Sequence, residues 1–147
     1  MTAYLKLNIL IIFSVLAPDW LMKHDLVTKQ IWANVRNSET DPFEGSGFAR
    51  GAYEGERVLI LPGEREGDIL VNARQHSIKI PAKFLIPQRP TSKGQDVVII
   101  CGDKVGEIYM TQKPNKDGTF PLGHHGYKGT SPLCTVEASR LARCDPK

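Results

Sequence analysis

The sequence predicts a mainly β protein, with two small units in tandem behind an irregular, partly helical N-terminal segment. A pattern of β-branched runs separated by glycines occurs twice, and the 147 residues include 13 glycines and 10 prolines, which suit a turn-rich β protein. An apolar fraction of 41% with 24% charged residues argues against wholesale disorder. Units this small have thin cores, so we expect them to pack against each other.

The repeated stretch reads V-L-I-L-P-G-E-R-E-G-D-I-L-V from Val58 and V-V-I-I-C-G-D-K-V-G-E-I-Y-M from Val97. Each copy has an apolar run, a glycine, three mostly charged residues, a second glycine and a second alternating run. Two strands joined by a tight turn produce this pattern, because glycine adopts the positive φ of a turn and apolar residues two apart share a face. The expected turn glycines are Gly63, Gly67, Gly102 and Gly106.

A second pair of matching segments follows the two hairpins. Residues 78–85 read I-K-I-P-A-K-F-L, and residues 134–141 read C-T-V-E-A-S-R-L. Each alternates and then ends in A-x-x-L, which predicts a strand that runs into one helical turn. The hairpins are offset by 39 residues and these closing segments by 56, so the second unit carries 17 extra residues (56 − 39). We place the extra residues in a loop over 112–128, in which N-K-D-G at 115–118 is a strong turn signal.

The pattern V-x-I-x-x-G-x-x-x-G-x-I resembles the KOW motif of ribosomal proteins and of NusG-type transcription elongation factors. The stretch I-P-A-K-F-L-I-P-Q-R-P, residues 80–90, is similar to linkers between KOW modules in the large subunit of the elongation factor DSIF. The resemblance covers about residues 53–146 and implies two SH3-like β-barrels. It also implies a non-catalytic role in contact with RNA, DNA or RNA polymerase-associated proteins, in the nucleus or else the cytoplasm. The chain departs from the family in showing no NusG-like α/β domain and no acidic tail.

The resemblance divides the chain into three parts. Residues 1–52 form the N-terminal segment, with a degenerate third module as an alternative; residues 53–90 form the first KOW-like module; and residues 91–147 form the second, including the inserted loop. The expected strands cover 57–61, 68–73, 75–80, 96–101, 107–111 and 133–136, with a helical turn over 81–85.

The N-terminal segment itself contains three signals. Pro18 indicates the start of a helix. Residues 30–36 predict a strand whose alternate apolar residues lie on one face and Trp32 on the other. Residues 5–17 superficially resemble a signal peptide, but the apolar run is short and cleavage at its end would place Pro18 next to the scissile bond. A buried strand or helix is the alternative, and the run is too short to span a membrane.

The distribution of charge says more than the net charge of +3. Residues 79–95 hold four basic residues and no acidic one, and the predicted loop combines lysines with aromatic residues. Nucleic-acid binding requires basic and aromatic groups on one face. The candidate contact residues are Lys79, Lys83, Arg89, Lys93, Lys113, Lys116, Phe120, Tyr127 and Lys128. The alternatives are a solvated face, a loop anchored by Phe120, and a protein–protein adaptor that uses strand edges without nucleic acid.

No motif for catalysis or metal binding is present, because G-x-S-x-G, the phosphate-binding G-x-x-x-x-G-K-[ST] and H-E-x-x-H are all missing. His124, His125, Cys134 and Cys144 fall within 21 residues, but their spacing fits no familiar zinc site. We therefore expect no catalytic residue, metal or cofactor. Three widely spaced cysteines fit free thiols in a reducing compartment.

Overall fold

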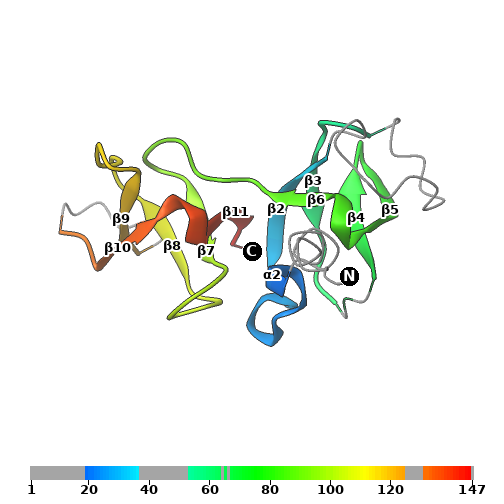
Figure 1. Ribbon diagram of the computed structural model, residues 1–147, viewed down its shortest axis with the longest axis horizontal. Helices are drawn as coiled ribbons and strands as arrows, with labels where there is room; N and C mark the ends of the chain where they lie inside the picture. The colour runs from blue at the N-terminus through cyan, green and yellow to red at the C-terminus, as the bar shows by residue number, and fades with distance from the viewer. Residues whose placement is uncertain (1–18, 37–52, 64, 66, 125–130, 147) are drawn as a thin grey trace, which may run out of the picture.

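The computed structural model describes residues 19–36, 53–63, 65, 67–124 and 131–146 (Figure 1). Within these residues, ten strands form one antiparallel sheet that does not close on itself. The strands are β2 (Gln30–Val35), β3 (Arg57–Ile60), β4 (Asp68–Ala73), β5 (His76–Pro81), β6 (Leu85–Pro87), β7 (Asp96–Ile99), β8 (Ile108–Thr111), β9 (Thr119–Gly123), β10 (Cys134–Glu137) and β11 (Leu141–Asp145). The helical elements are α2 (Asp19–Met22), η1 (His24–Leu26), η4 (Ala82–Phe84) and η5 (Ala138–Arg140). The predicted mainly β class is confirmed.

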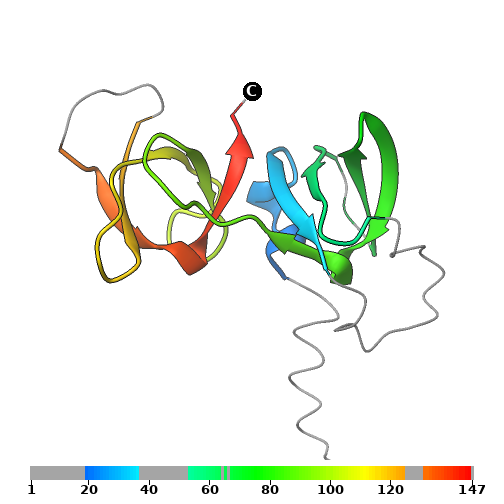
Figure 2. The same ribbon diagram turned by 90° about the horizontal axis from the view of Figure 1, so that it is seen from above.

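The strands fall into two groups that share one order. In the first group, β2 to β5 pair in sequence, and β6 returns after η4 to pair with β2. In the second group, β7 to β10 pair in sequence, and β11 returns after η5 to pair with β7. Figure 2 shows the two groups side by side. They are joined where β11 of the second group pairs with β2 of the first.

The two closing segments occupy equivalent places, but the two glycine hairpins do not. Ile80 and Val136 are buried in β5 and β10, and each strand runs into a 3-10 turn that begins at Ala82 or Ala138, as predicted. The first glycine hairpin is β3–β4, the second hairpin of its group, whereas the other is β7–β8, the first hairpin of its group. This shift arises because β2 precedes β3 and comes from the segment that the sequence assigned to the N-terminal region.

The prediction of a loop over residues 112–128 is wrong where β9 lies. This strand pairs with both β8 and β10. Pro121 disguised the strand, because proline removes a donor from the ladder and is typical of loops. Its carbonyl accepts a hydrogen bond from the Gln112 N–H at 2.8 Å. The turn at 115–118 is confirmed, with Gly118 at φ 87° and its N–H donating to the carbonyl of Asn115.

The first core consists of the following residues: Trp20, Leu21, Leu26, Ile31, Ala33, Val35, Val58, Ile60, Ile69, Val71, Ala73, Ile80, Ala82, Phe84, Leu85, Val98, Ile100, Ala142 and Cys144. The second core consists of Val97, Ile99, Tyr109, Phe120, Leu122, Val136 and Leu141. Neighbouring residues of β7 and of β11 therefore face different cores, so these two strands form a wall between them. A continuous apolar run such as V-V-I-I is expected of a strand buried on both faces.

The segment before β2 ties the two groups together. Helix α2 begins at Asp19, which confirms the predicted helix start, and Leu21 and Leu26 are fully buried in the first core. The Lys23 ammonium donates to the carbonyl of Ile100 at 3.0 Å, from the first group to the second. The expected packing of one unit against the other is confirmed by these contacts and by the shared wall. The possible signal peptide, residues 5–17, lies outside the described residues.

Candidate nucleic-acid interface

An arginine is stacked on a tryptophan at the junction of the two groups. Alternation along β2 buries Ile31, Ala33 and Val35 and leaves Trp32 on the opposite face, as predicted. The guanidinium carbon of Arg57, at the start of β3, lies 3.7 Å from the centroid of the Trp32 ring. This is ordinary carbon–carbon contact distance, so the guanidinium lies flat on the ring. Its Nε donates to Oε1 of Gln88 at 2.7 Å, which fixes the plane.

A second arginine stands on the same face. Cys144 pairs with Ile31 and both point into the first core, so Arg143, the residue before Cys144, points to the same side of the sheet as Trp32. Burial, and then the positive charge of Arg143, lower the pKa of Arg57. The Nε of Arg143 is buried and has no hydrogen-bond partner among the described residues. Two positively charged side chains therefore stand near each other on this face of the sheet.

We call Trp32, Asn34, Arg57, Gln88 and Arg143 the junction face. Asn34 pairs with Arg57 across the β2–β3 ladder and is exposed. One acidic residue, Asp145, ends the same face beside Gln30 and offsets part of its charge. The junction face thus combines an aromatic ring, two guanidinium groups and two side-chain amides.

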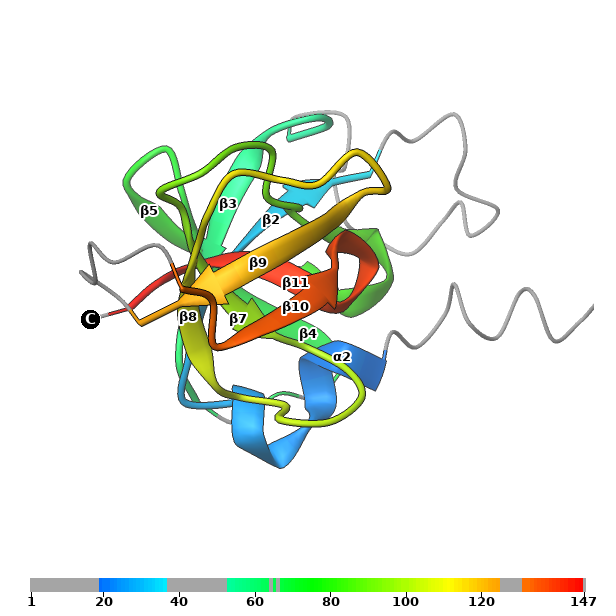
Figure 3. The same cartoon turned by 90° about the vertical axis from the view of Figure 1, so that its left-hand side faces the viewer.

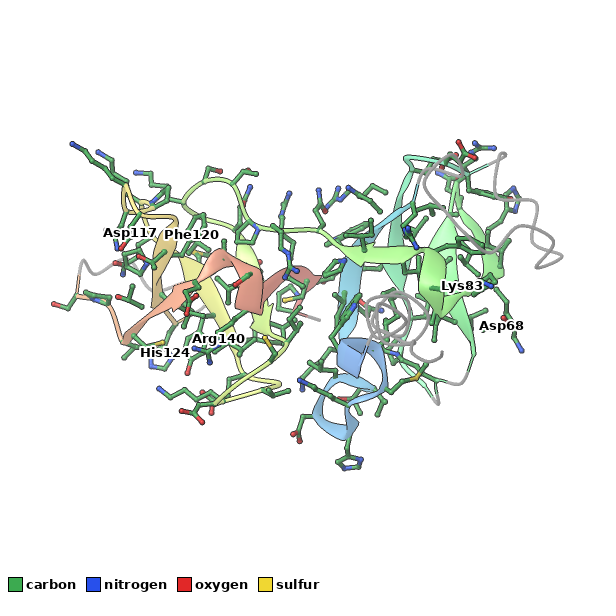
Figure 4. The ribbon with its side chains drawn as sticks, viewed as in Figure 1. Asp68, Lys83, Asp117, Phe120, His124 and Arg140 are labelled. Carbon is green, nitrogen blue, oxygen red and sulfur yellow. The ribbon has the colours of Figure 1, made fainter. Side chains whose placement is uncertain are left out.

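Two of the predicted contact residues, Lys79 and Lys83, are not part of the junction face. Lys79 is exposed on β5, at the end of the strand order opposite to β10, where it lines a shallow cleft of about 280 Å³ with Arg65, Asp68 and Leu70. The Lys83 ammonium lies 5.5 Å from the centroid of the Phe84 ring. Figure 4 shows Asp68 and Lys83 together in the first group.

Arg89 holds the connector between β6 and β7 in place. Its Nη1 donates to the carbonyls of Ser139 and Leu141, both at 2.9 Å. Burial lowers its pKa. These contacts attach the connector to η5 and β11, so Arg89 has a structural task that the prediction of a phosphate contact did not include.

Three predicted lysines lie at one end of the second group. Lys93, Lys113 and Lys116 are all exposed. The hydroxyl of Thr111, at the end of β8, donates to the carbonyl of Ser92 at 2.7 Å. The connector turn that holds Lys93 is therefore attached to β8 just before Lys113. Figures 1 and 3 show the connector and the β8–β9 turn along the same upper side of the molecule.

Of the two aromatic residues predicted for this surface, Phe120 is described and is not exposed. Phe120 is 4% exposed and belongs to the second core, so its prediction as a stacking surface is wrong and its interpretation as an anchor holds. Tyr109 is also buried in the second core, and its hydroxyl donates to Glu107. That hydrogen bond and burial raise the pKa of Tyr109 to about 12. Tyr127 and Lys128 lie outside the described residues.

The motif glycines shape turns. Gly63, Gly102 and Gly106 have φ of 135°, 83° and 93°, as predicted. The carbonyl of Gly67 accepts from the Ala82 N–H at 2.8 Å, which joins its hairpin to η4. A Cβ at Gly102 would lie 2.8 Å from Nε of Arg140.

The described part of the chain has no cluster of three His, Cys, Asp or Glu side chains that could hold a metal ion. His124 is exposed, Cys144 is buried, and His125 lies outside those residues. None of the helices described is long and apolar enough to cross a membrane.

Trp32, Arg57 and Arg143 were not among the predicted contact residues. A local signal for Trp32 was present, because a large aromatic residue faced outward on an otherwise apolar strand. The two arginines carried no such signal, since only the pairing of β11 with β2 and of β2 with β3 brings them to Trp32. Comparison with protein-family models and with curated proteins gives no match for this chain.

Proposed function

We propose that this protein is a non-catalytic nucleic-acid-binding module made of two tandem SH3-like barrels of the KOW type. The common order of the two groups supports the fold assignment: four strands pair in sequence, a 3-10 turn follows, and a fifth strand returns to the first. Contact with RNA polymerase-associated proteins and a nuclear location rest on the KOW resemblance alone.

The observation that carries the function is the Arg57–Trp32 stack with Arg143 beside it. A phosphate bound between the two guanidinium groups would relieve their repulsion and accept several charge-assisted hydrogen bonds. An aromatic residue next to them favours a ligand that carries bases as well as phosphates. Lys93, on the connector, and Lys113, just after β8, are exposed and add positive charge that a nucleic-acid backbone could follow.

A protein–protein adaptor would instead use the sheet edges, β5 and β10. On β5, Lys79 and Pro81 reduce the capacity to add another strand, because natural sheets protect their edges with lysine and proline. The β5 edge is therefore poorly suited to an added strand, and the junction face is the feature that favours nucleic acid as the partner.

The test is binding of the whole chain to mixed-sequence RNA and to duplex DNA at about 50 and about 200 mM salt. We expect affinity to fall steeply with salt, with a log–log slope of about −0.7 to −0.9 per phosphate contacted. The double variant Arg57→Ala/Arg143→Ala should bind about tenfold or more weakly at low salt and show a shallower slope.

Arg74→Ala is the matched control, because Arg74 also lies over an aromatic ring, that of Tyr53 at 4.9 Å, but is ion-paired with Glu56. Its affinity should equal that of the unaltered protein. Binding that ignores salt, or no binding to either nucleic acid at low salt, would contradict the proposed function and favour the adaptor.

A further inference from the structure

We infer that the junction face selects single-stranded nucleic acid, with one unpaired base stacked on the outer side of the Arg57 guanidinium and an adjacent phosphate held by Arg143. This inference rests on the proposed function and specifies its ligand.

The Arg57 plane is already set for stacking. Trp32 covers one side of it, at 3.7 Å, and Gln88 holds Nε. Arg57 is an exposed residue, so its side chain is accessible to a ligand. Among the described residues, no carboxylate pairs with Arg57, whose Nε donates its hydrogen bond to Gln88. A guanidinium fixed before binding loses little side-chain entropy when a ligand stacks on it.

The fixed guanidinium plane of Arg57 should distinguish single-stranded from duplex nucleic acid, because the two differ in how accessible their base faces are. Proteins stack unpaired bases on aromatic rings and on guanidinium planes. A base inside a duplex has neighbours on both faces, and reaching it requires unstacking. A single strand offers an open base face without that cost, so a flat, fixed guanidinium favours the single strand.

Two neighbours on the junction face supply further polar groups for a ligand stacked on Arg57. Cys144 pairs with Ile31, so Arg143 lies next to Trp32 across the β11–β2 ladder, and its charge contributes to the lowered pKa of Arg57; this position suits a phosphate adjoining the stacked base. Asn34 is paired with Arg57 and exposed, and its amide can both donate to and accept from a base edge. Phosphate, base plane and base edge thus each have a partner on the face.

A second arginine–aromatic pair, Arg74 over Tyr53, lacks the features that favour ligand binding at Arg57. Arg74 lies over Tyr53, 4.9 Å from the ring centroid, but its guanidinium is paired with Glu56. The carboxylate cancels the charge that a phosphate would need. A base or phosphate is therefore expected at Arg57 and not at Arg74.

The experiment compares one mixed-sequence RNA strand with the same strand annealed to its complement, using the whole chain and two lysine variants. The unaltered protein should bind the single strand about tenfold more tightly than the duplex. Arg57→Lys keeps the positive charge but loses the planar guanidinium, so it should weaken single-strand binding about tenfold. The same variant should change duplex affinity and the salt slope by less than about twofold. Arg74→Lys should leave both affinities unchanged.

Tryptophan fluorescence gives a second measurement. Trp20 is 9% exposed and lies in the first core, whereas Trp32 is only partly buried. A base stacked on the Arg57–Trp32 pair should change the Trp32 emission, and the duplex should change it less. A thermal unfolding curve shows that each variant is folded.

Two failures are distinguishable. If the duplex binds as tightly as the single strand, or if Arg57→Lys keeps full single-strand affinity, the inference is overturned while the proposed function stands. If neither nucleic acid binds, both are overturned.

Discussion

The two groups of strands have the same order but unequal cores. Among the described residues, the first core gathers 19 buried residues and the second only 7. Four of the 19 belong to the second group: Val98, Ile100, Ala142 and Cys144. The second group therefore gives one face of β7 and of β11 to its neighbour's core.

This difference teaches how two small units become stable together. A unit of this size buries too little apolar surface to be robust alone. Sharing two strands lets each of them bury both faces, so the second group gains stability only while the first is folded. The first group in turn gains four apolar residues that its own segment does not supply.

The largest expected effect comes from truncating the second core. Ile99 is fully buried there, and Ile99→Ala should lower the free energy of unfolding by about 2–5 kcal/mol. Trp20 lies in α2, just before the first group, and Trp32 lies in β2 of that group. Tryptophan fluorescence therefore reports unfolding of the first group. Because the wall is shared, Ile99→Ala should shift the urea midpoint seen by tryptophan fluorescence, as Ile60→Ala in the first core should also do.

Far-UV circular dichroism, which reports both groups, is the control for this comparison. We expect the two probes to give coincident transitions for every variant. A dichroism transition that moves while the fluorescence transition stays in place would mean that the groups unfold separately, and would break the comparison.

Gly106 tests the contact between the β7–β8 turn and η1. It has φ 93°, and a Cβ there would lie 2.8 Å from Cβ and 2.9 Å from the carbonyl oxygen of Asp25 in η1. Gly106→Ala should therefore cost about 2–3 kcal/mol, from the positive φ and from displacement of η1. Gly118→Ala is the matched control, because Gly118 has φ 87° with nothing within 4 Å, and it should cost only about 1 kcal/mol. Equal urea midpoints for the two variants would show that η1 can move away from residue 106 without a cost in stability.

Hydrogen bonds from Arg140 add to the stability of the second group, whose apolar core is small. The Nε and Nη2 of Arg140 donate to the carbonyls of Cys101 and Asp103, both at 2.9 Å, and hold the β7–β8 turn against η5. Arg140→Ala should destabilise the protein by about 1–2 kcal/mol, because water replaces part of what is lost at a half-buried site. Arg140→Lys should recover some of this, since one ammonium can reach one of the two carbonyls. A urea midpoint unchanged by Arg140→Ala would indicate that the turn is held by its backbone alone.

The sequence was informative where structure is local. Strand β4 begins and ends where predicted, because its exposed and buried residues alternate without exception over Asp68–Ala73. The closing segments were located from the same alternation followed by A-x-x-L. Strand β9 was missed because Pro121 is typical of loops. Strands β6 and β11 were missed because each directly follows a 3-10 turn, and no strand was predicted after either turn.

The candidate site depends on structure that is not local. The junction face needs β11 beside β2 and β2 beside β3, pairings that join distant parts of the chain and leave no mark on sequence periodicity. The basic stretch over 79–95 was visible in the sequence, but strand geometry distributes Lys79, Arg89 and Lys93 over separate places. A run of basic residues in the sequence therefore did not predict a single basic surface in the structure.

The smallest effect concerns Cys144, which the second group contributes to the first core. Burial, reinforced by the charges of Asp96 and Asp145, raises the pKa of this thiol to about 12. The unfolded chain releases the proton near pH 8.5 while the folded chain keeps it, so the stabilisation is complete below that pH and is lost as pH rises toward 12. Between about pH 7.5 and about pH 9.5, the unaltered protein should lose about 1 kcal/mol more stability than Cys144→Ala, measured by urea unfolding at both values. Equal losses would mean that the Cys144 thiol ionises as readily in the folded protein as in the unfolded chain, and that the shared wall admits water at its β11 end.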